Sequence, residues 1–188
     1  MRFLAMDIET TGIDPATSDI LELGVVLRDT MYPHFCEKIC IKVKPKMWES
    51  SCITWHNDQG NLQYHLDPAG RVESNEVCSI LTRWFIGNGI HEPLTVAGKN
   101  FGSFDLRYLC KLPGYLKSGK FAFHKTRIYD LGMAYAQGLN IPTLGEIINR
   151  VGYNAWPKPD WVKELKPHQA LWDAWTVSEI VRSKLEIQ

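Results

Sequence analysis

The chain has 188 residues, of which 45% are hydrophobic and 22% charged, and its formal net charge is +0. This length and composition predict one globular domain over residues 1–188 with a sizeable core. They argue against a membrane-spanning helix, because no apolar run approaches the roughly 18 residues that such a span needs. Composition alone gives no evidence for nucleic-acid binding, although a local basic patch would suffice for it.

The N-terminus runs from Met1 and Arg2 directly into an apolar stretch, so no secretory signal is evident. The five cysteines are an odd number, and they form neither a disulfide framework nor a Cys/His pattern typical of zinc sites. We therefore expect reduced thiols and a cytoplasmic protein.

The first expected element is a strand over residues 2–9. Alternation along a strand places apolar side chains on one face, namely Leu4, Met6 and Ile8. The other face carries Ala5, Asp7 and Glu9. Two carboxylates on one face of a central strand are costly to bury without a cation, and oxygen ligands suit Mg²⁺ or Mn²⁺. The alternative is an edge strand with two solvated acids.

Two further strands are expected, over residues 20–28 and up to about Lys44, after a turn-rich segment at 13–19. Three consecutive strands without an intervening helix predict an antiparallel meander. Lysines share one face of the third strand, namely Lys38, Lys42 and Lys44. This stripe either steers a phosphate backbone or is simply a solvated face.

Residues 46–70 are expected to form an irregular loop that is rich in aromatic side chains. Trp55 and His56 are the candidates in this loop for contact with a base, since every base offers a face for stacking. The alternative is that these rings anchor the loop to the core.

The second half of the chain predicts helices alternating with short strands. A helix is expected from Ser74, its N-cap, to Ile86, followed by a buried strand over residues 94–97. Ser103 is expected to cap a helix that runs through Cys110 and carries Asp105 in its first turn, where an acid suits the helix dipole.

Residues 121–131 predict another strand, with Asp130 opening a helix that reaches about Gln137. Thr143 has the spacing of a capping box ahead of an apolar run that stops at Gly152. Residues 153–167 are expected to be a Trp/Pro-rich loop, and the last helix to run from about Pro167 to Leu185.

Three motifs occur in order along these elements: Asp7-x-Glu9-Thr10-x-Gly12, Asn100-x-x-x-Phe104-Asp105 and His168-x-Ala170-x-x-Asp173-Ala174. Together they resemble the three exonuclease motifs of the DEDDh family of 3′→5′ exonucleases. This family includes polymerase proofreading subunits, the ribonuclease T group and oligoribonucleases. The resemblance extends from residue 3 to about residue 185.

The resemblance implies an RNase H-like α/β fold with a central mixed five-stranded sheet flanked by helices. It also implies a metal-dependent 3′→5′ exonuclease in which two divalent cations, Mg²⁺ or Mn²⁺, are held by Asp7, Glu9, Asp105 and Asp173. His168 is the implied general base for the attacking water. A histidine with a pKa near 6.5 suits this role at neutral pH.

By the same resemblance, the backbone of Thr10, Thr11 and Gly12 cradles the terminal nucleotide, while Asn100 and Phe104 line the groove. The implied partners are single-stranded DNA, RNA or short oligonucleotides, and a possible homodimer, since free-standing relatives commonly form one. The alternative function is a catalytically inactive exonuclease-fold module that binds nucleic acid or acts as a scaffold. Its usual signs, a replaced acid or a missing histidine, do not occur in this sequence.

Overall fold

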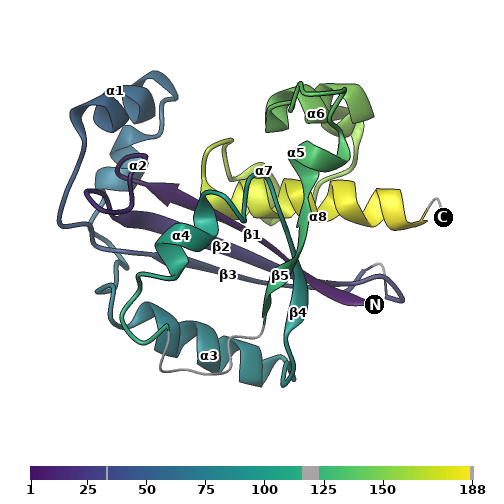
Figure 1. Ribbon diagram of the computed structural model, residues 1–188, viewed down its shortest axis with the longest axis horizontal. Coiled ribbons are helices and arrows are strands. Elements are labelled where there is room, and N and C mark those ends of the chain that lie inside the picture. The colour runs from purple at the N-terminus through teal and green to yellow at the C-terminus, as the bar shows by residue number, and fades with distance from the viewer. Residues whose placement is uncertain (33, 116–122, 187–188) are drawn as a thin grey trace.

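A mixed five-stranded sheet forms the centre of the molecule, and the computed structural model describes residues 1–32, 34–115 and 123–186 (Figure 1). The strands are β1 (Arg2–Thr10), β2 (Ile20–Asp29), β3 (Cys36–Lys42), β4 (Leu94–Gly98) and β5 (Phe123–Asp130). Their order in the sheet is β3-β2-β1-β4-β5. The first three strands form the expected antiparallel meander, whereas β4 pairs in parallel with β1 and β5 in parallel with β4.

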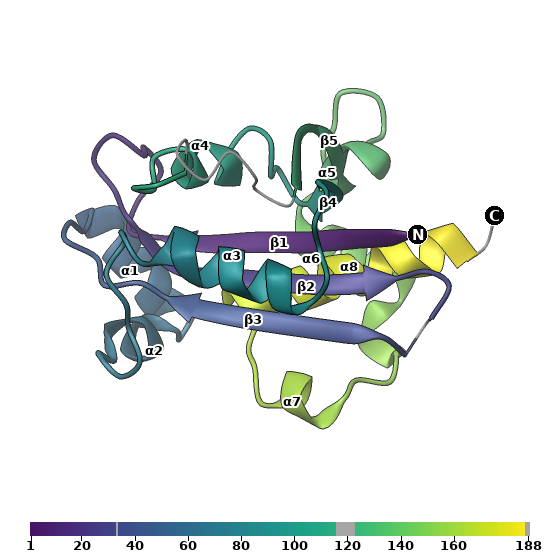
Figure 2. The ribbon, with the colours of Figure 1, turned by 90° about the horizontal axis from the view of Figure 1, so that it is seen from below.

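The two faces of the sheet are covered by different helices (Figures 1 and 2). Helix α3 (Val77–Gly87) packs on the face that carries Leu4, Met6 and Ile8, as the alternation of β1 predicted. Helix α8 (Ala170–Glu186) packs on the opposite face with Phe3 and Ala5. Because Asp7 and Glu9 have the parity of Ala5, they lie on the α8 face, at the end of β1 where the sheet meets the first turn of α8.

The remaining helices are short and lie around the ends and edges of the sheet. They are α1 (Ser50–Asp58), α2 (Leu62–Leu66), α4 (Asp105–Leu109), α5 (Leu131–Ala134), α6 (Leu144–Val151), a 3₁₀ turn (Tyr153–Ala155) and α7 (Asp160–Lys163). No described helix is long and apolar enough to cross a membrane.

Several caps follow the expected chemistry. Asp130 caps α5 by accepting a hydrogen bond from the Met133 amide at 3.2 Å, and Thr143 forms the complete capping box of α6. Gly152 ends α6 with φ of 68°, a left-handed conformation that glycine adopts without steric cost.

Other boundaries differ from the predictions. The segment 46–70 is not a plain loop, since it contains α1 and α2. Helix α3 begins after Glu76 rather than Ser74, and α4 begins after Phe104 rather than Ser103. In both cases no side-chain cap is present, so packing of the buried face sets the start of the helix.

The C-terminal segments also differ. Helix α5 ends at Ala134, short of Gln137, and the segment 153–167 contains the 3₁₀ turn and α7. Helix α8 begins at Ala170 rather than Pro167, because His168 has φ of 61° and cannot belong to a right-handed helix. Residues 121 and 122 of the expected strand lie outside the described residues.

The lysine stripe of β3 is neither a free phosphate track nor fully solvated. The Lys38 ammonium lies 4.2 Å from the centre of the Trp161 ring, and that of Lys42 lies 3.9 Å from the Tyr64 ring. Lys44 forms an ion pair with Glu73 at 3.2 Å. Each lysine therefore has a local partner.

Close packing of β2 against α8 sets the position of the last helix. A Cβ atom added to Gly24 would overlap the backbone carbon and oxygen of Ala170, so only glycine allows this approach. We expect Gly24→Ala to lower the free energy of unfolding by about 1–3 kcal/mol, because backbone atoms must move to accept the methyl group. Thermal unfolding measures the loss, with Gly87→Ala as the control, since no atom lies within 4 Å of a Cβ there. Equal melting temperatures for the two variants would contradict this account of the contact.

Candidate functional site

Most of the expected site residues line one cavity of about 340 Å³ where β1, α4 and α8 meet. Those residues are Asp7, Glu9, Trp55, Asn100, Phe104, Asp105, His168 and Asp173. The three motifs, which extend from Asp7 to Asp173 in sequence, therefore come together in space.

The four acids are positioned by three different elements. Asp7 and Glu9 alternate on one face of β1, and Asp173 lies in the first turn of α8, which crosses that face. Asp105 opens α4, and its Oδ1 accepts a hydrogen bond from the Ile8 amide at 3.0 Å. This bond fixes the third acid directly beside the first two.

Burial and mutual repulsion make this cluster unfavourable when all the acids are charged. Burial is the main cause that raises the pKa of Asp105 to about 8 and that of Asp173 to about 7. Burial, together with repulsion from Asp173 and the other acids, also raises the pKa values of Asp7 and Glu9 well above their usual range. A bound cation that contacts these carboxylates would remove the cost of holding them in the charged form.

No described lysine, arginine or histidine forms an ion pair with any of the four acids. Buried carboxylates without a protein cation are the oxygen ligands that Mg²⁺ and Mn²⁺ prefer. The residues that are present therefore fit a site for divalent cations.

His168 lines the same cavity and lies two residues before the start of α8. One of its ring nitrogens and carboxylate oxygens of Glu9 and Asp173 all lie within 4.8 Å of one another. The ring packs edge-on against Trp55, with 4.9 Å between ring centres. Burial, with a smaller effect of His56, lowers the pKa of His168, which favours the neutral imidazole.

Two motif residues hold left-handed backbone conformations. Asn100 and His168 both have φ of 61°, and among the described residues they are the only non-glycine residues with positive φ. Such conformations cost about 1–3 kcal/mol each and persist only where the surrounding structure imposes them. Both residues line the acidic cavity, so the strain is concentrated at this site.

A second cavity of about 500 Å³ adjoins the first and shares Glu9, Trp55 and Phe104 with it. Thr10, Gly12 and His56 line it as well. Its lining is largely apolar, which suits the face of a base or ribose. Thr11 does not line either cavity: it is fully buried, and its amide bonds to the Asp19 carbonyl at 2.9 Å.

Helices α1 and α2 bring His56 and His65 together, and both rings are buried. His56 Nε2 lies 3.1 Å from the Thr10 carbonyl oxygen, and His65 Nε2 lies 3.4 Å from that of His168. The ring centres are 4.5 Å apart. Burial lowers the pKa of His56. Burial, together with repulsion from a protonated His56, lowers the pKa of His65 to about 4. Both rings are therefore neutral at pH 7.

Sequence reasoning missed Glu22, which is only 1% exposed and lies opposite Glu9 in the sheet. Its carboxylate accepts hydrogen bonds from the Tyr64 hydroxyl at 2.6 Å and from the Ala170 amide at 3.1 Å. Glu22 thus ties α2 and the start of α8 to the sheet. A glutamate in an alternating strand gives no signal of this role, because its partners are distant in sequence.

Lys99 was also missed. It is the only lysine or arginine among the described residues that line the acidic cavity. It directly follows β4 and precedes Asn100, and no motif spacing identified it.

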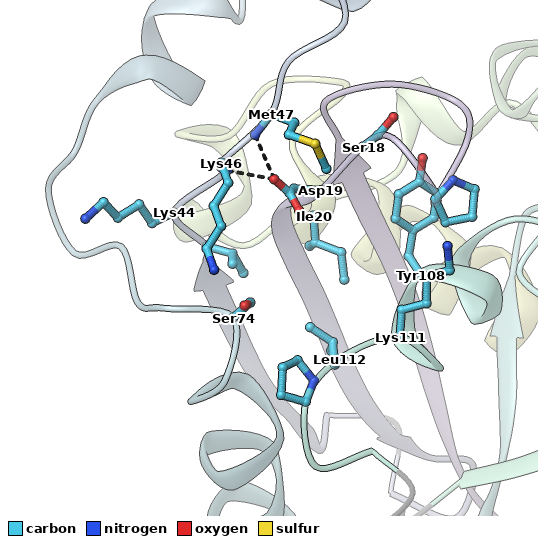
Figure 3. A pocket seen from close by; sticks show the side chains of 13 residues that line it. Ser18, Asp19, Ile20, Lys44, Lys46, Met47, Ser74, Tyr108, Lys111 and Leu112 are labelled. Carbon is cyan, nitrogen blue, oxygen red and sulfur yellow. Dashed lines mark hydrogen bonds between the residues drawn. The ribbon is translucent and has the colours of Figure 1, made fainter.

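A third cavity, of about 140 Å³, contains none of the expected site residues (Figure 3). Its rim includes Lys44, Lys46 and Lys111. The Asp19 carboxylate on this rim accepts hydrogen bonds from the amides of Lys46 and Met47 at 2.6 and 2.9 Å. These contacts hold the turn after β1 against the chain that leads to α1.

The fold of the chain is similar to that of a solved nuclease structure, although its sequence matches no protein-family model and no curated protein. Among solved structures, the chain is similar to the nuclease domain of 3′hExo, described as a DEDDh family member and solved bound to rAMP. The TM-score is 0.66 at 17% sequence identity, and the match covers 99% of this chain and 92% of that one. The chain therefore has the RNase H-like fold of a DEDDh exonuclease, as the motifs implied.

Proposed function

We propose that this protein is a metal-dependent 3′→5′ exonuclease that hydrolyses single-stranded nucleic acid or short oligonucleotides. The observation that carries the proposal is the convergence of four acids and His168 on one cavity. Three of the acids are buried, and none of the four forms an ion pair among the described residues. The fold shared with a DEDDh nuclease domain supports the same conclusion.

Asp7, Glu9, Asp105 and Asp173 are the residues that would hold two divalent cations. When bound, such a pair stabilises both the attacking and the leaving oxygen of an in-line displacement at phosphorus. The raised pKa values of these acids mean that their charged forms are unfavourable without cations. Bound cations would stabilise the ionised carboxylates, so cation binding should release protons.

His168 takes the proton of the attacking water in this proposal. Its lowered pKa keeps the imidazole unprotonated at neutral pH, as a general base requires. Trp55 packs against the ring and limits its rotation, so the accepting nitrogen stays directed at the cluster.

The adjoining cavity is the proposed place of the 3′-terminal nucleotide. Phe104 and Trp55 border both cavities, so they are placed to hold a base on one side while its phosphate meets the acids. Thr10, Gly12 and His56 would complete the nucleotide contact, and Asn100 the groove. Thr11 would act through the backbone turn that it anchors.

The proposal is tested with 5′-labelled DNA and RNA of one sequence, single-stranded, in the presence of Mg²⁺ or Mn²⁺. We expect a ladder that shortens from the 3′ end and disappears with a chelator and in Asp7→Ala. The exposed Asp58→Ala is the control and should leave the ladder unchanged. No cleavage by folded, metal-loaded protein would instead support the inactive binding module. Homodimer formation and the cytoplasmic location stay predictions.

A further inference from the structure

A second group of potential metal ligands lies beside the acidic cluster. Glu9 on β1, His56 on α1 and His65 on α2 each place one ligand atom within 4.8 Å of the other two. All three side chains are buried, and the two rings are at most 1% exposed. Only Glu9 is shared with the four acids of the proposed catalytic cluster.

The hydrogen bonds of the two rings fix which nitrogens are available. A carbonyl oxygen can only accept, so each Nε2 that faces one must carry the hydrogen. Each neutral ring then has its lone pair on Nδ1. Both Nδ1 atoms are buried and have no hydrogen-bond partner.

Two buried acceptors without hydrogen-bond partners are costly, and a bound ion or water would satisfy them. The arrangement also has the outer hydrogen bonds that are typical of metal-binding histidines, which donate their other N–H to a carbonyl or carboxylate. The rings are thus fixed in the tautomer that coordination through Nδ1 requires.

We propose that Glu9, His56 and His65 form a third metal site, selective for a transition metal such as Zn²⁺ over Mg²⁺. Two imidazole nitrogens and one carboxylate make a three-ligand zinc set that leaves a fourth position open. In a tetrahedral zinc site the ligand atoms lie about 3.3 Å apart. Here they lie within 4.8 Å of one another, so we expect the side chains to move closer together when zinc binds. Magnesium, in contrast, prefers oxygen ligands alone.

A cation at this site would act on the neighbouring one through Glu9. If the proposed function holds, zinc would withdraw Glu9 from the catalytic cations and inhibit the nuclease. It would also tie α1 and α2 to β1, close to the chain that carries His168, because Asn61 Nδ2 bonds to the Pro167 carbonyl at 2.8 Å.

The test measures Zn²⁺ binding by calorimetry in saturating Mg²⁺ and without nucleic acid, so its outcome does not depend on nuclease activity. We expect one zinc per chain, with affinity reduced at least 10-fold in His65→Ala and unchanged in the exposed-histidine control His91→Ala. Circular dichroism confirms that each variant is folded.

Nitrogen-15 NMR of the wild-type protein gives a second measurement that needs no variant. Zinc should shift the Nδ1 resonances of His56 and His65 and leave those of the exposed His34 and His91 in place. Absence of zinc binding under Mg²⁺ would overturn the proposal. A zinc-induced shift at His168 with His56 and His65 unchanged would also overturn it, because the metal would then bind Glu9, His168 and Asp173.

Discussion

Asp105→Asn is expected to abolish nuclease activity while raising the melting temperature of the metal-free protein. The carboxylate is only 3% exposed, and burial raises its pKa to about 8. The Asn side chain keeps an oxygen that can accept the hydrogen bond from the Ile8 amide, which is 3.0 Å long in the present structure, so we expect the local structure to be retained. The substitution removes a buried charge but also a ligand for the cations.

The two effects have opposite signs and different sizes. Loss of one cation ligand should cost several kcal/mol of transition-state stabilisation, or about 10³-fold in rate. Removal of the charge should stabilise the metal-free protein by roughly 2 kcal/mol, or a Tm rise of about 4–8 °C for a chain of this size. Asp58→Asn, on an exposed position, is the matched control and should change neither quantity.

The same account predicts how the stability of the metal-free protein changes with pH. The folded-state pKa values of Asp105 and Asp173, about 8 and about 7, exceed the ordinary value of 3.8. Between these limits the folded protein binds more protons than the unfolded chain, so stability should fall as pH rises from about 4 to 8. Asp105→Asn should weaken this slope, and saturating Mg²⁺ should raise the wild-type Tm most at pH 8.

Thermal unfolding with and without Mg²⁺ at pH 5, 6.5 and 8 measures these effects. A metal-free wild type that is more stable at pH 8 than at pH 5 would contradict the charged-cluster account. So would an Asp105→Asn variant whose Tm rises with Mg²⁺ as much as that of the wild type.

Local periodicity predicted the sheet because each strand carries its own signal. Leu4, Met6 and Ile8 alternate with Ala5 and Asp7, and the two sets do pack on opposite faces. Caps were predicted where side chain and backbone meet within three residues, as at Thr143 and Asp130. Such interactions join residues only three positions apart, so the local sequence is enough to predict them.

Features set by distant contacts were not predicted. Helix α1 buries only His56, so it has no apolar stripe to mark it in the sequence. Helix α8 starts late because His168 is held in a left-handed conformation by its surroundings. Glu22 joins residues from β3, α2 and α8, and none of these lies near it in sequence.

The candidate site shows the same division. The motifs pointed to all four acids and their resemblance implied one metal site. The contacts that bring the acids together are distant in sequence: α8 packs on β1, and Asp105 bonds to the Ile8 amide. The pairing of His56 with His65 could not be predicted, since it depends on the turn between two helices that were not expected.

His168→Ala is expected to lower kcat by about 10²–10⁴-fold with little change in KM, because a positioned general base contributes that much to proton transfer. The ring is half-buried, and one of its nitrogens lies within 4.8 Å of carboxylate oxygens of two acids, where it could accept a proton from a water held by the cluster. His91→Ala, at an exposed position, should retain full activity.

The pH profile separates a base from a structural residue. Burial lowers the pKa of His168 below 6.5, so wild-type kcat should be constant near neutral pH and fall as pH drops through that lowered pKa. In His168→Ala this acid limb should disappear, since no imidazole is left to protonate. A variant that loses activity and keeps the limb would show that another group titrates.

The left-handed backbone at His168 supplies a second control. Gly adopts φ of 61° without steric cost, so His168→Gly should be about 1 kcal/mol more stable than His168→Ala. Both variants lack the imidazole and should be equally inactive. If His168→Gly recovered activity over His168→Ala, backbone geometry rather than the ring would be the contribution of this residue, and the assignment of a general base at position 168 would fail.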